Sequence, residues 1–125
     1  MLSYKEYDNA HAVEIVIGGR ISTEEFDAIA AKLEAFIKRH GRVRLLEIVE
    51  DFEGMDAAAF WHDLKFSLRH LKDFSRLAVV VEPEVQHLWS RLVAPFMECR
   101  VEHFTPSEVE AARDWLVWPE GAADI

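Results

Sequence analysis

The architecture follows from one short stretch in the first half of the chain, Val43-Arg44-Leu45-Leu46-Glu47-Ile48-Val49. Apolar residues are adjacent at positions 45–46 and again at 48–49, so an extended chain would carry them on both faces. Strands of this kind lie inside sheets that are covered on both sides. Residues 77–81 form a second fully apolar run of strand length. We therefore expect two interior strands of a mostly parallel sheet.

The first twenty residues predict a β-hairpin. Residues 2–7 have strand composition, Asp8-Asn9 is a turn signal, and apolar residues alternate from position 12 to 17. We expect Gly18-Gly19 to end the second strand.

Capping signals mark two helices. Ser22-Thr23-Glu24-Glu25 is a capping box followed by apolar residues at helical spacing, and Gly41 ends that helix. Thr105-Pro106-Ser107-Glu108 is a second capping box, which begins a final helix that runs to about Trp115.

Two more helices and an edge strand complete the chain. A helix is expected over residues 57–72 with Asp56 as N-cap, and another begins at Pro83. Val101 and Phe104 belong to a short, more polar strand at an edge of the sheet.

The resulting order is β-β-α-β-α-β-α-β-α, which predicts an α/β fold. We expect one domain over residues 1–125, with a mostly parallel five-stranded sheet, an antiparallel N-terminal hairpin strand and about four helices. If successive strands are neighbours, the crossover helices share one side. The opposite face of the sheet would then be thinly covered, which favours a ligand or a partner there.

The charge balance disfavours nucleic acid as a partner. The net charge is −9, and the nearest approach to a cationic stripe, Arg39, Arg42 and Arg44, is followed at once by acidic residues. The same charge repels an anionic membrane at long range, so any membrane contact has to be hydrophobic and local.

The sequence also predicts the compartment. The one cysteine, Cys99, excludes an internal disulfide and suits a reducing environment. No signal peptide or membrane-spanning run is recognisable, so we expect a cytoplasmic protein, peripheral at the membrane if lipid is its ligand.

Motifs for catalysis and for metal binding are not recognisable. The chain has no phosphate-binding glycine loop and no nucleophile elbow. His62 and His70 lie eight residues apart, roughly 12 Å along a helix, which is too far for one ion to bridge. The acidic run of residues 47–53 is interpreted as a solvated loop rather than a cation site. We expect no enzyme activity, metal or cofactor.

Excess apolar surface is the most informative feature. The helix after Pro83 spreads its apolar residues over roughly 180°, wider than a helix packed on a sheet needs. On the helix over residues 57–72, Phe66 is expected opposite the main apolar face, and Trp115 and Trp118 are further candidates for an exposed patch. The residues expected to line a ligand site or interface are Phe60, Trp61, Phe66, Trp89, Val93, Phe96 and Met97.

Several stretches resemble the SpoIIAA-like family of small bacterial proteins. They are residues 50–54, 60–66, 70–74, 78–80, 104–108 and 112–116. The resemblance implies a STAS-type fold. Anti-sigma-factor antagonists of this fold carry a phosphorylated serine after an Asp at the start of the second helix. Here Asp56 is followed by Ala57-Ala58-Ala59, so we expect no phosphorylation switch.

The family resemblance also implies lipophilic ligands or membrane association, for which the excess apolar surface is suited. The main hypothesis is therefore a non-enzymatic binding module for a lipophilic small molecule or a membrane surface. The alternative is a protein-interaction or regulatory module, or a homodimer, that uses the same patch. An enzyme whose residues assemble only in space is a third reading.

Overall fold

A five-stranded sheet lies at the centre of the computed structural model, which describes residues 1–70, 72–84 and 99–117. The strands stand in the order β1-β2-β3-β4-β5. β1 is antiparallel to β2, and the other neighbouring pairs are parallel. This confirms the predicted α/β sheet with its N-terminal hairpin strand. The strand bounds are β1 Leu2–Tyr7, β2 Ala12–Ile21, β3 Val43–Met55, β4 Phe74–Val80 and β5 Arg100–Phe104.

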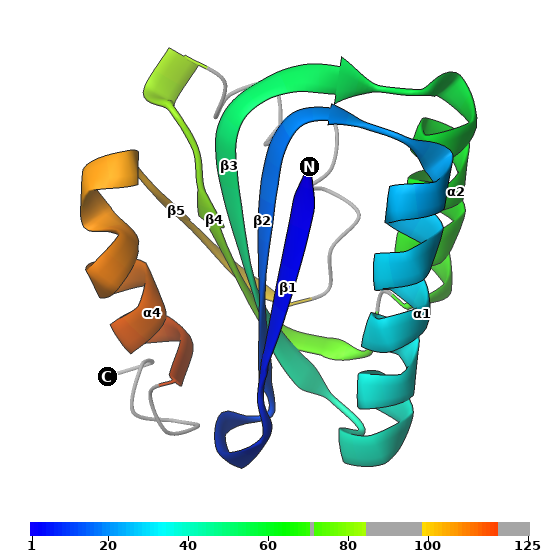
Figure 1. Ribbon diagram of the computed structural model, residues 1–125. Helices are drawn as coiled ribbons and strands as arrows, with labels where there is room; N and C mark the ends of the chain where they lie inside the picture. The colour runs from blue at the N-terminus through cyan, green and yellow to red at the C-terminus, as the bar shows by residue number, and fades with distance from the viewer. Residues whose placement is uncertain (71, 85–98, 118–125) are drawn as a thin grey trace.

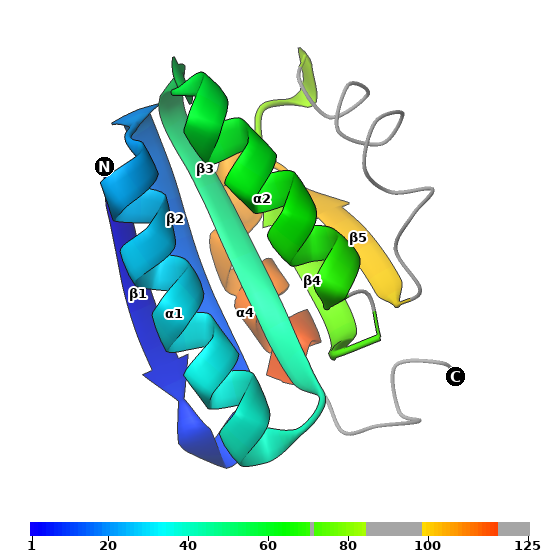
Figure 2. The same ribbon diagram turned by 90° about the vertical axis from the view of Figure 1, so that its right-hand side faces the viewer.

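Helices cover both faces of this sheet. α1 (Thr23–His40) and α2 (Ala57–Arg69) lie side by side on one face, and α4 (Val109–Val117) lies on the other (Figures 1 and 2). Short 3-10 turns occupy Asp8–Ala10 and Pro106–Glu108. Pro83 and Glu84 are helical, as expected for a helix that begins at Pro83, and residues 85–98 lie outside the described residues.

The helix ends form where the capping signals place them. The Ser22 hydroxyl accepts a hydrogen bond from the Glu25 amide at 3.2 Å, and the Glu25 carboxylate accepts one from the Ser22 amide at 3.0 Å. Gly41 donates its amide to the Ile37 carbonyl and ends α1. Glu108 accepts from the Thr105 amide at 2.8 Å, and the turn it stabilises leads into α4. These local contacts satisfy amides that a helix end leaves without partners.

The larger core lies between the sheet and the α1–α2 layer. It includes Val13, Leu45, Leu77 and Val79 from the strands and Phe36 from α1. A second core lies between the sheet and α4, where Leu46, Ile48, Ala78 and Val80 contact Ala112, Trp115 and Leu116. As expected, the crossover helices α1 and α2 lie on the same side of the sheet (Figures 1 and 2). The expectation that the other face would be thinly covered is wrong over the part that α4 occupies.

Trp115 is therefore a core residue and not part of an exposed patch. Its side chain is 8% exposed, and its ring lies 6.2 Å from that of Phe104. The final helix turns back over the sheet after the edge strand β5, which brings this tryptophan onto the strands. Trp118 lies outside the described residues.

Gly18-Gly19 bends β2 but does not end it. The register between β2 and β3 shifts on both sides of Gly19, and pairing continues to Ile21. A Cβ at Gly18 would lie 2.9 Å from the Glu50 carbonyl oxygen, and Gly19 has a φ of +60°. Glycine is the residue that permits both the close approach and the left-handed backbone, as in a β-bulge.

The acidic run at residues 47–53 is part of a strand, not a loop. β3 continues through it to Met55, because the bulged end of β2 supplies paired backbone as far as Ile21. Glu50, Asp51 and Glu53 are exposed, as expected for charged side chains, and Phe52 between them is exposed too, whereas Glu47 is partly buried.

Candidate functional site

The outward side of α2 carries two exposed, large apolar side chains. Trp61 is 57% exposed and Leu68 is 53% exposed, seven residues apart and therefore about two turns along one helix face. Lys65 and Arg69 are exposed between and beside them. We call these four residues the outer stripe of α2.

Phe66 lies on the inward side of α2, so its predicted exposure is wrong. It is 6% exposed and stands in the core beside Phe26 of α1, with the two rings edge to face and 6.4 Å apart. Five residues separate it from Trp61, which is roughly 140° around a helix. Ala59 is fully buried on the same inward side.

Most of the other predicted lining residues fall on parts of the chain that the structure does not describe. Trp89, Val93, Phe96 and Met97 lie outside the described residues, as does the side chain of Phe60. Trp61 is the predicted residue that the structure places on an exposed surface, and its neighbours Lys65 and Arg69 were not predicted. Residues 61, 65 and 69 are four apart, and this helical spacing could have predicted that they share one face of α2.

A shallow hollow of about 280 Å³ follows the seam between α1 and α2 and adjoins the outer stripe. Phe26, Ala30 and Phe66 contribute its apolar part, and Asp27, His62, Lys65 and Arg69 its polar part. The His62 ring lies 2.7 Å from the Asp27 carboxylate, and Arg69 lies 3.7 Å from Glu34. These pairs join the two helices and make the hollow a polar one.

Two acidic side chains lie between the sheet and α2. Glu47 pairs in register with Ile15 and Val79, both buried, and its side chain shares their side of the sheet. Burial raises the pKa of Glu47 to about 7, and the nearby charge of Asp63 adds to the rise. Burial also raises the pKa of Asp63 to about 6. This pair was not predicted from the sequence, because Glu47 belongs to an acidic run whose other charged residues are exposed.

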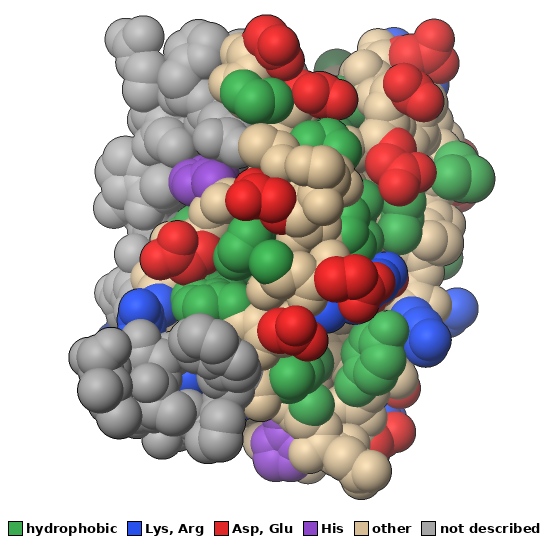
Figure 3. Space-filling model, turned by 90° about the vertical axis from the view of Figure 1, so that its left-hand side faces the viewer, with side chains coloured by type: hydrophobic (Ala, Val, Ile, Leu, Met, Phe, Trp, Pro, Cys, Tyr) green, Lys and Arg blue, Asp and Glu red, His purple; other side chains and the backbone are tan. Residues whose placement is uncertain are grey.

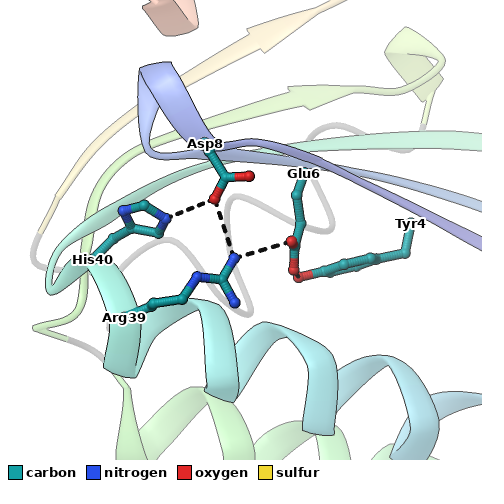
Figure 4. A network of polar contacts seen from close by, with 5 residues as sticks. All are labelled: Tyr4, Glu6, Asp8, Arg39 and His40. Atoms are coloured by element: carbon teal, nitrogen blue, oxygen red, sulfur yellow. Dashed lines mark hydrogen bonds and ion pairs between the residues drawn. The ribbon is translucent and has the colours of Figure 1, made fainter.

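A polar network joins the hairpin to the last turn of α1 (Figure 4). Arg39 donates to Glu6 at 3.2 Å and to Asp8 at 3.1 Å, and the His40 ring lies 2.9 Å from Asp8. The Tyr4 hydroxyl donates to Glu6 at 2.6 Å. Contacts with His40 and Arg39 lower the pKa of the Asp8 carboxyl. Cations in the last turn of a helix also stabilise its C-terminus, so this network is explained as a structural tether.

The described residues do not assemble a metal site or an activated thiol. Among them no group of three or more His, Cys, Asp or Glu side chains could hold an ion. His62 and His70 point to separate acids, Asp27 and Asp73. Burial raises the pKa of the Cys99 thiol, which disfavours the reactive thiolate.

Among the described residues of the face that carries α4, no comparable stripe is present. Acidic side chains there are scattered among the hydrophobic ones (Figure 3). No helix among the described residues combines the length and hydropathy that crossing a bilayer requires.

Comparison with known proteins agrees with the fold. The model of the SpoIIAA-like family matches residues 12–117. A solved structure of an uncharacterized protein with a SpoIIAA-like fold, from Shewanella loihica PV-4, superposes with a TM-score of 0.76. It is 22% identical, and the match covers 93% of this chain and 92% of that one. No curated protein gives a significant match.

Proposed function

The chain belongs to the SpoIIAA-like family, and on that premise we propose that it is a non-enzymatic, STAS-like binding module that associates reversibly with anionic membrane surfaces. The outer stripe of α2 is the contact. The observation that carries this proposal is the exposure of Trp61 and Leu68 on one helix face, with Lys65 and Arg69 beside them.

The chemistry of the stripe suits the boundary between lipid and water. Helices that lie in this plane combine a hydrophobic side with Lys and Arg, and tryptophan is enriched at that depth because its ring is amphipathic. Lysine and arginine can extend their charged ends toward phosphates while their methylene chains stay in the apolar region. The stripe has each of these components within nine residues.

The ionic strength sets the distance over which the net charge of −9 repels an anionic surface. Beyond roughly 8 Å at physiological salt, the repulsion from distant acidic residues is screened. Lys65 and Arg69 act within that distance, each contributing about 1 kcal/mol at an anionic surface. Binding should therefore be local and sensitive to salt.

The expected affinity is low. Trp61 and Leu68 are already about half buried, so insertion would gain for each roughly half of the 1.5–3 kcal/mol that full burial of a large apolar side chain provides. With the two cations, the total of about 3.5–5 kcal/mol corresponds to a partition constant on the order of 10³ M⁻¹, below that of one myristoyl chain. Such binding is readily reversed.

A lipophilic small molecule is a weaker candidate on this surface. The hollow beside the stripe is shallow and lined mainly by charged or polar side chains, whereas small-molecule sites are concave and mostly apolar. Self-association through the stripe is also less favoured. A two-fold interface would bring Lys65 and Arg69 of two copies together, and like charges in an interface are unfavourable.

Co-sedimentation with vesicles tests the proposal. We expect the protein to pellet with phosphatidylglycerol-containing vesicles more than with phosphatidylcholine alone, and less as salt is added. Trp61→Ala and Leu68→Ala should each reduce partitioning about fivefold, since each removes roughly 1 kcal/mol. Val117→Ala is the matched control, because Val117 is 47% exposed but lies on α4, across the sheet.

Three results would count against the proposal. The first is no partitioning at millimolar anionic lipid. The second is an equal loss in the Val117 variant. The third is a concentration-dependent dimer in sedimentation velocity that Trp61→Ala abolishes, which would assign the stripe to self-association.

A further inference from the structure

A second hollow, of about 600 Å³, lies at the amino-terminal edge of the parallel strands. It is bounded by the 3-10 turn after β1, the starts of β3 and β4, and the last residue of α4. Its lining residues are Asn9, Ala10, His11, Arg42, Arg44, Ser75 and Val117. Ligands of open α/β sheets usually bind at the opposite, carboxyl edge, so the fold alone does not explain this hollow.

The hollow is basic in an otherwise acidic protein. Two arginines and a histidine line it, and none of its described lining residues is acidic. The acids next to it in the chain are engaged elsewhere. Asp8 contacts Arg39 and His40, and Asp73 contacts His70. These two carboxylates therefore have partners outside the lining of the hollow.

The Arg42 guanidinium has more N–H donors than its hydrogen bond to Phe74 uses. Arg42 is exposed, and one N–H of its guanidinium donates to the Phe74 carbonyl at 3.1 Å. A guanidinium carries five N–H donors in a planar fork that matches carboxylate and phosphate oxygens. The bond to Phe74 fixes the position of a side chain that lines the hollow.

Arg44, which lines the hollow, belongs to a row of three arginines that crosses the sheet. Arg44, Arg76 and Arg100 are direct cross-strand partners on β3, β4 and β5, and so project from one side of the sheet. Arg76 is 2% exposed, donates to the Trp115 carbonyl at 3.0 Å and stacks over the Trp115 ring. All three contact further groups. Their alignment gathers three guanidinium groups on the side of the sheet that faces α4.

We propose that this hollow binds a small soluble anion that carries a carboxylate or phosphate group. Arg42 and Arg44 hold the oxygens, with the hydroxyl of Ser75 and the amide of Asn9 as further polar contacts. Ala10 and Val117 contact the apolar part of the ligand. The site lies on other elements than the outer stripe of α2, so it does not depend on membrane binding.

Titration with inorganic phosphate, followed by amide chemical shifts, tests this site. Sodium chloride at equal ionic strength is the reference, and succinate is the carboxylate probe. We expect saturable shifts at residues 9–11, 42–44 and 75, with a dissociation constant on the order of 1 mM. Arg42→Ala should weaken binding about tenfold, and Arg42→Lys should weaken it less because it keeps the charge without the fork.

The control is Arg20→Ala, which removes the same charge from a residue paired with Asp56 at the other end of the strands. Equal weakening by this variant, or shifts no larger than those in sodium chloride, would overturn the proposal. Loss of vesicle binding in Arg42→Ala would also overturn it, because the cations would then serve lipid headgroups. Trp61→Ala should leave phosphate binding unchanged.

Discussion

Arg113 of α4 forms a two-point ion pair with Glu14 of β2, across 99 residues of chain. Its Nε lies 2.9 Å from one carboxylate oxygen, and its Nη2 lies 3.2 Å from the other. Glu14 is 9% exposed, and the Tyr7 hydroxyl lies 3.4 Å from its first oxygen. The contact with Glu14 raises the pKa of Arg113. This pair joins the last helix to the sheet.

Arg113→Ala should therefore destabilise the fold by about 2 kcal/mol, because it leaves the Glu14 carboxylate buried without its charged partner. Urea denaturation measures the change. Glu110→Gln is the control, since Glu110 also contacts Arg113 but is 81% exposed, and it should change stability by less than about 0.5 kcal/mol. Equal effects of the two variants would show that Glu14 contributes nothing beyond a surface pair.

The orientation of α2 predicts opposite outcomes for its two aromatic residues. Phe66→Ala should cost about 3 kcal/mol or more in the free energy of unfolding, because it empties a packed site beside Phe26. Trp61→Ala should cost less than about 1 kcal/mol, although it removes a larger ring, since that ring is 57% exposed. Thermal or urea unfolding of the two variants would decide, and the reverse order would contradict this orientation.

The acidic pair under α2 predicts a pH effect. The pKa values of Glu47 and Asp63 in the folded protein, about 7 and about 6, lie above their ordinary values of 4.5 and 3.8. The folded state therefore binds more protons than the unfolded state between about pH 4 and about pH 7. The contribution of these two groups to stability is largest at the acidic end of this range, falls as the pH rises, and is level above it.

Glu47→Gln removes the carboxyl group whose pKa is raised more. The free energy of unfolding of this variant, relative to that of the wild type, should rise by about 2 kcal/mol when the pH is raised from about 5 to about 8. The reason is that glutamine carries no charge that would have to be buried at the higher pH. Urea denaturation at both pH values gives this difference. Glu50→Gln, an exposed change on the same strand, should show little gain. A Glu47→Gln gain no larger than that of Glu50→Gln would mean that water reaches the pair.

The capping box of α1 gives a fourth prediction. Ser22→Ala removes the acceptor of the Glu25 amide and should destabilise the protein by about 1 kcal/mol, while Ser22→Asp should retain most of the stability. Lys38→Ala serves as a reference, because its contact with Glu34 is an exposed pair on the same helix. Urea denaturation midpoints that are the same for Ser22→Ala and Lys38→Ala would contradict the role of the cap.

Features that depend on residues close together in the chain could be predicted from the amino-acid sequence. The Ser22–Glu25 and Thr105–Glu108 boxes, the stop at Gly41 and the interior strand at residues 43–49 involve contacts within a few residues or a local hydrophobic pattern. The local geometry of helix capping and the period of the hydrophobic pattern are enough to predict these features. The order of strands and helices follows from them, and with it the α/β sheet.

Which faces are buried depends on contacts between elements that are distant in the chain. Helix α2 has apolar residues on more than one side, and the contact of Phe66 with Phe26 of α1 selects the inward one. Trp115 is buried because α4 turns back over β3 and β4, and Glu47 is partly buried because β2 and β4 flank it with Ile15 and Val79. Burial is a property of the neighbours that surround a side chain, and those neighbours lie tens of residues away in the chain.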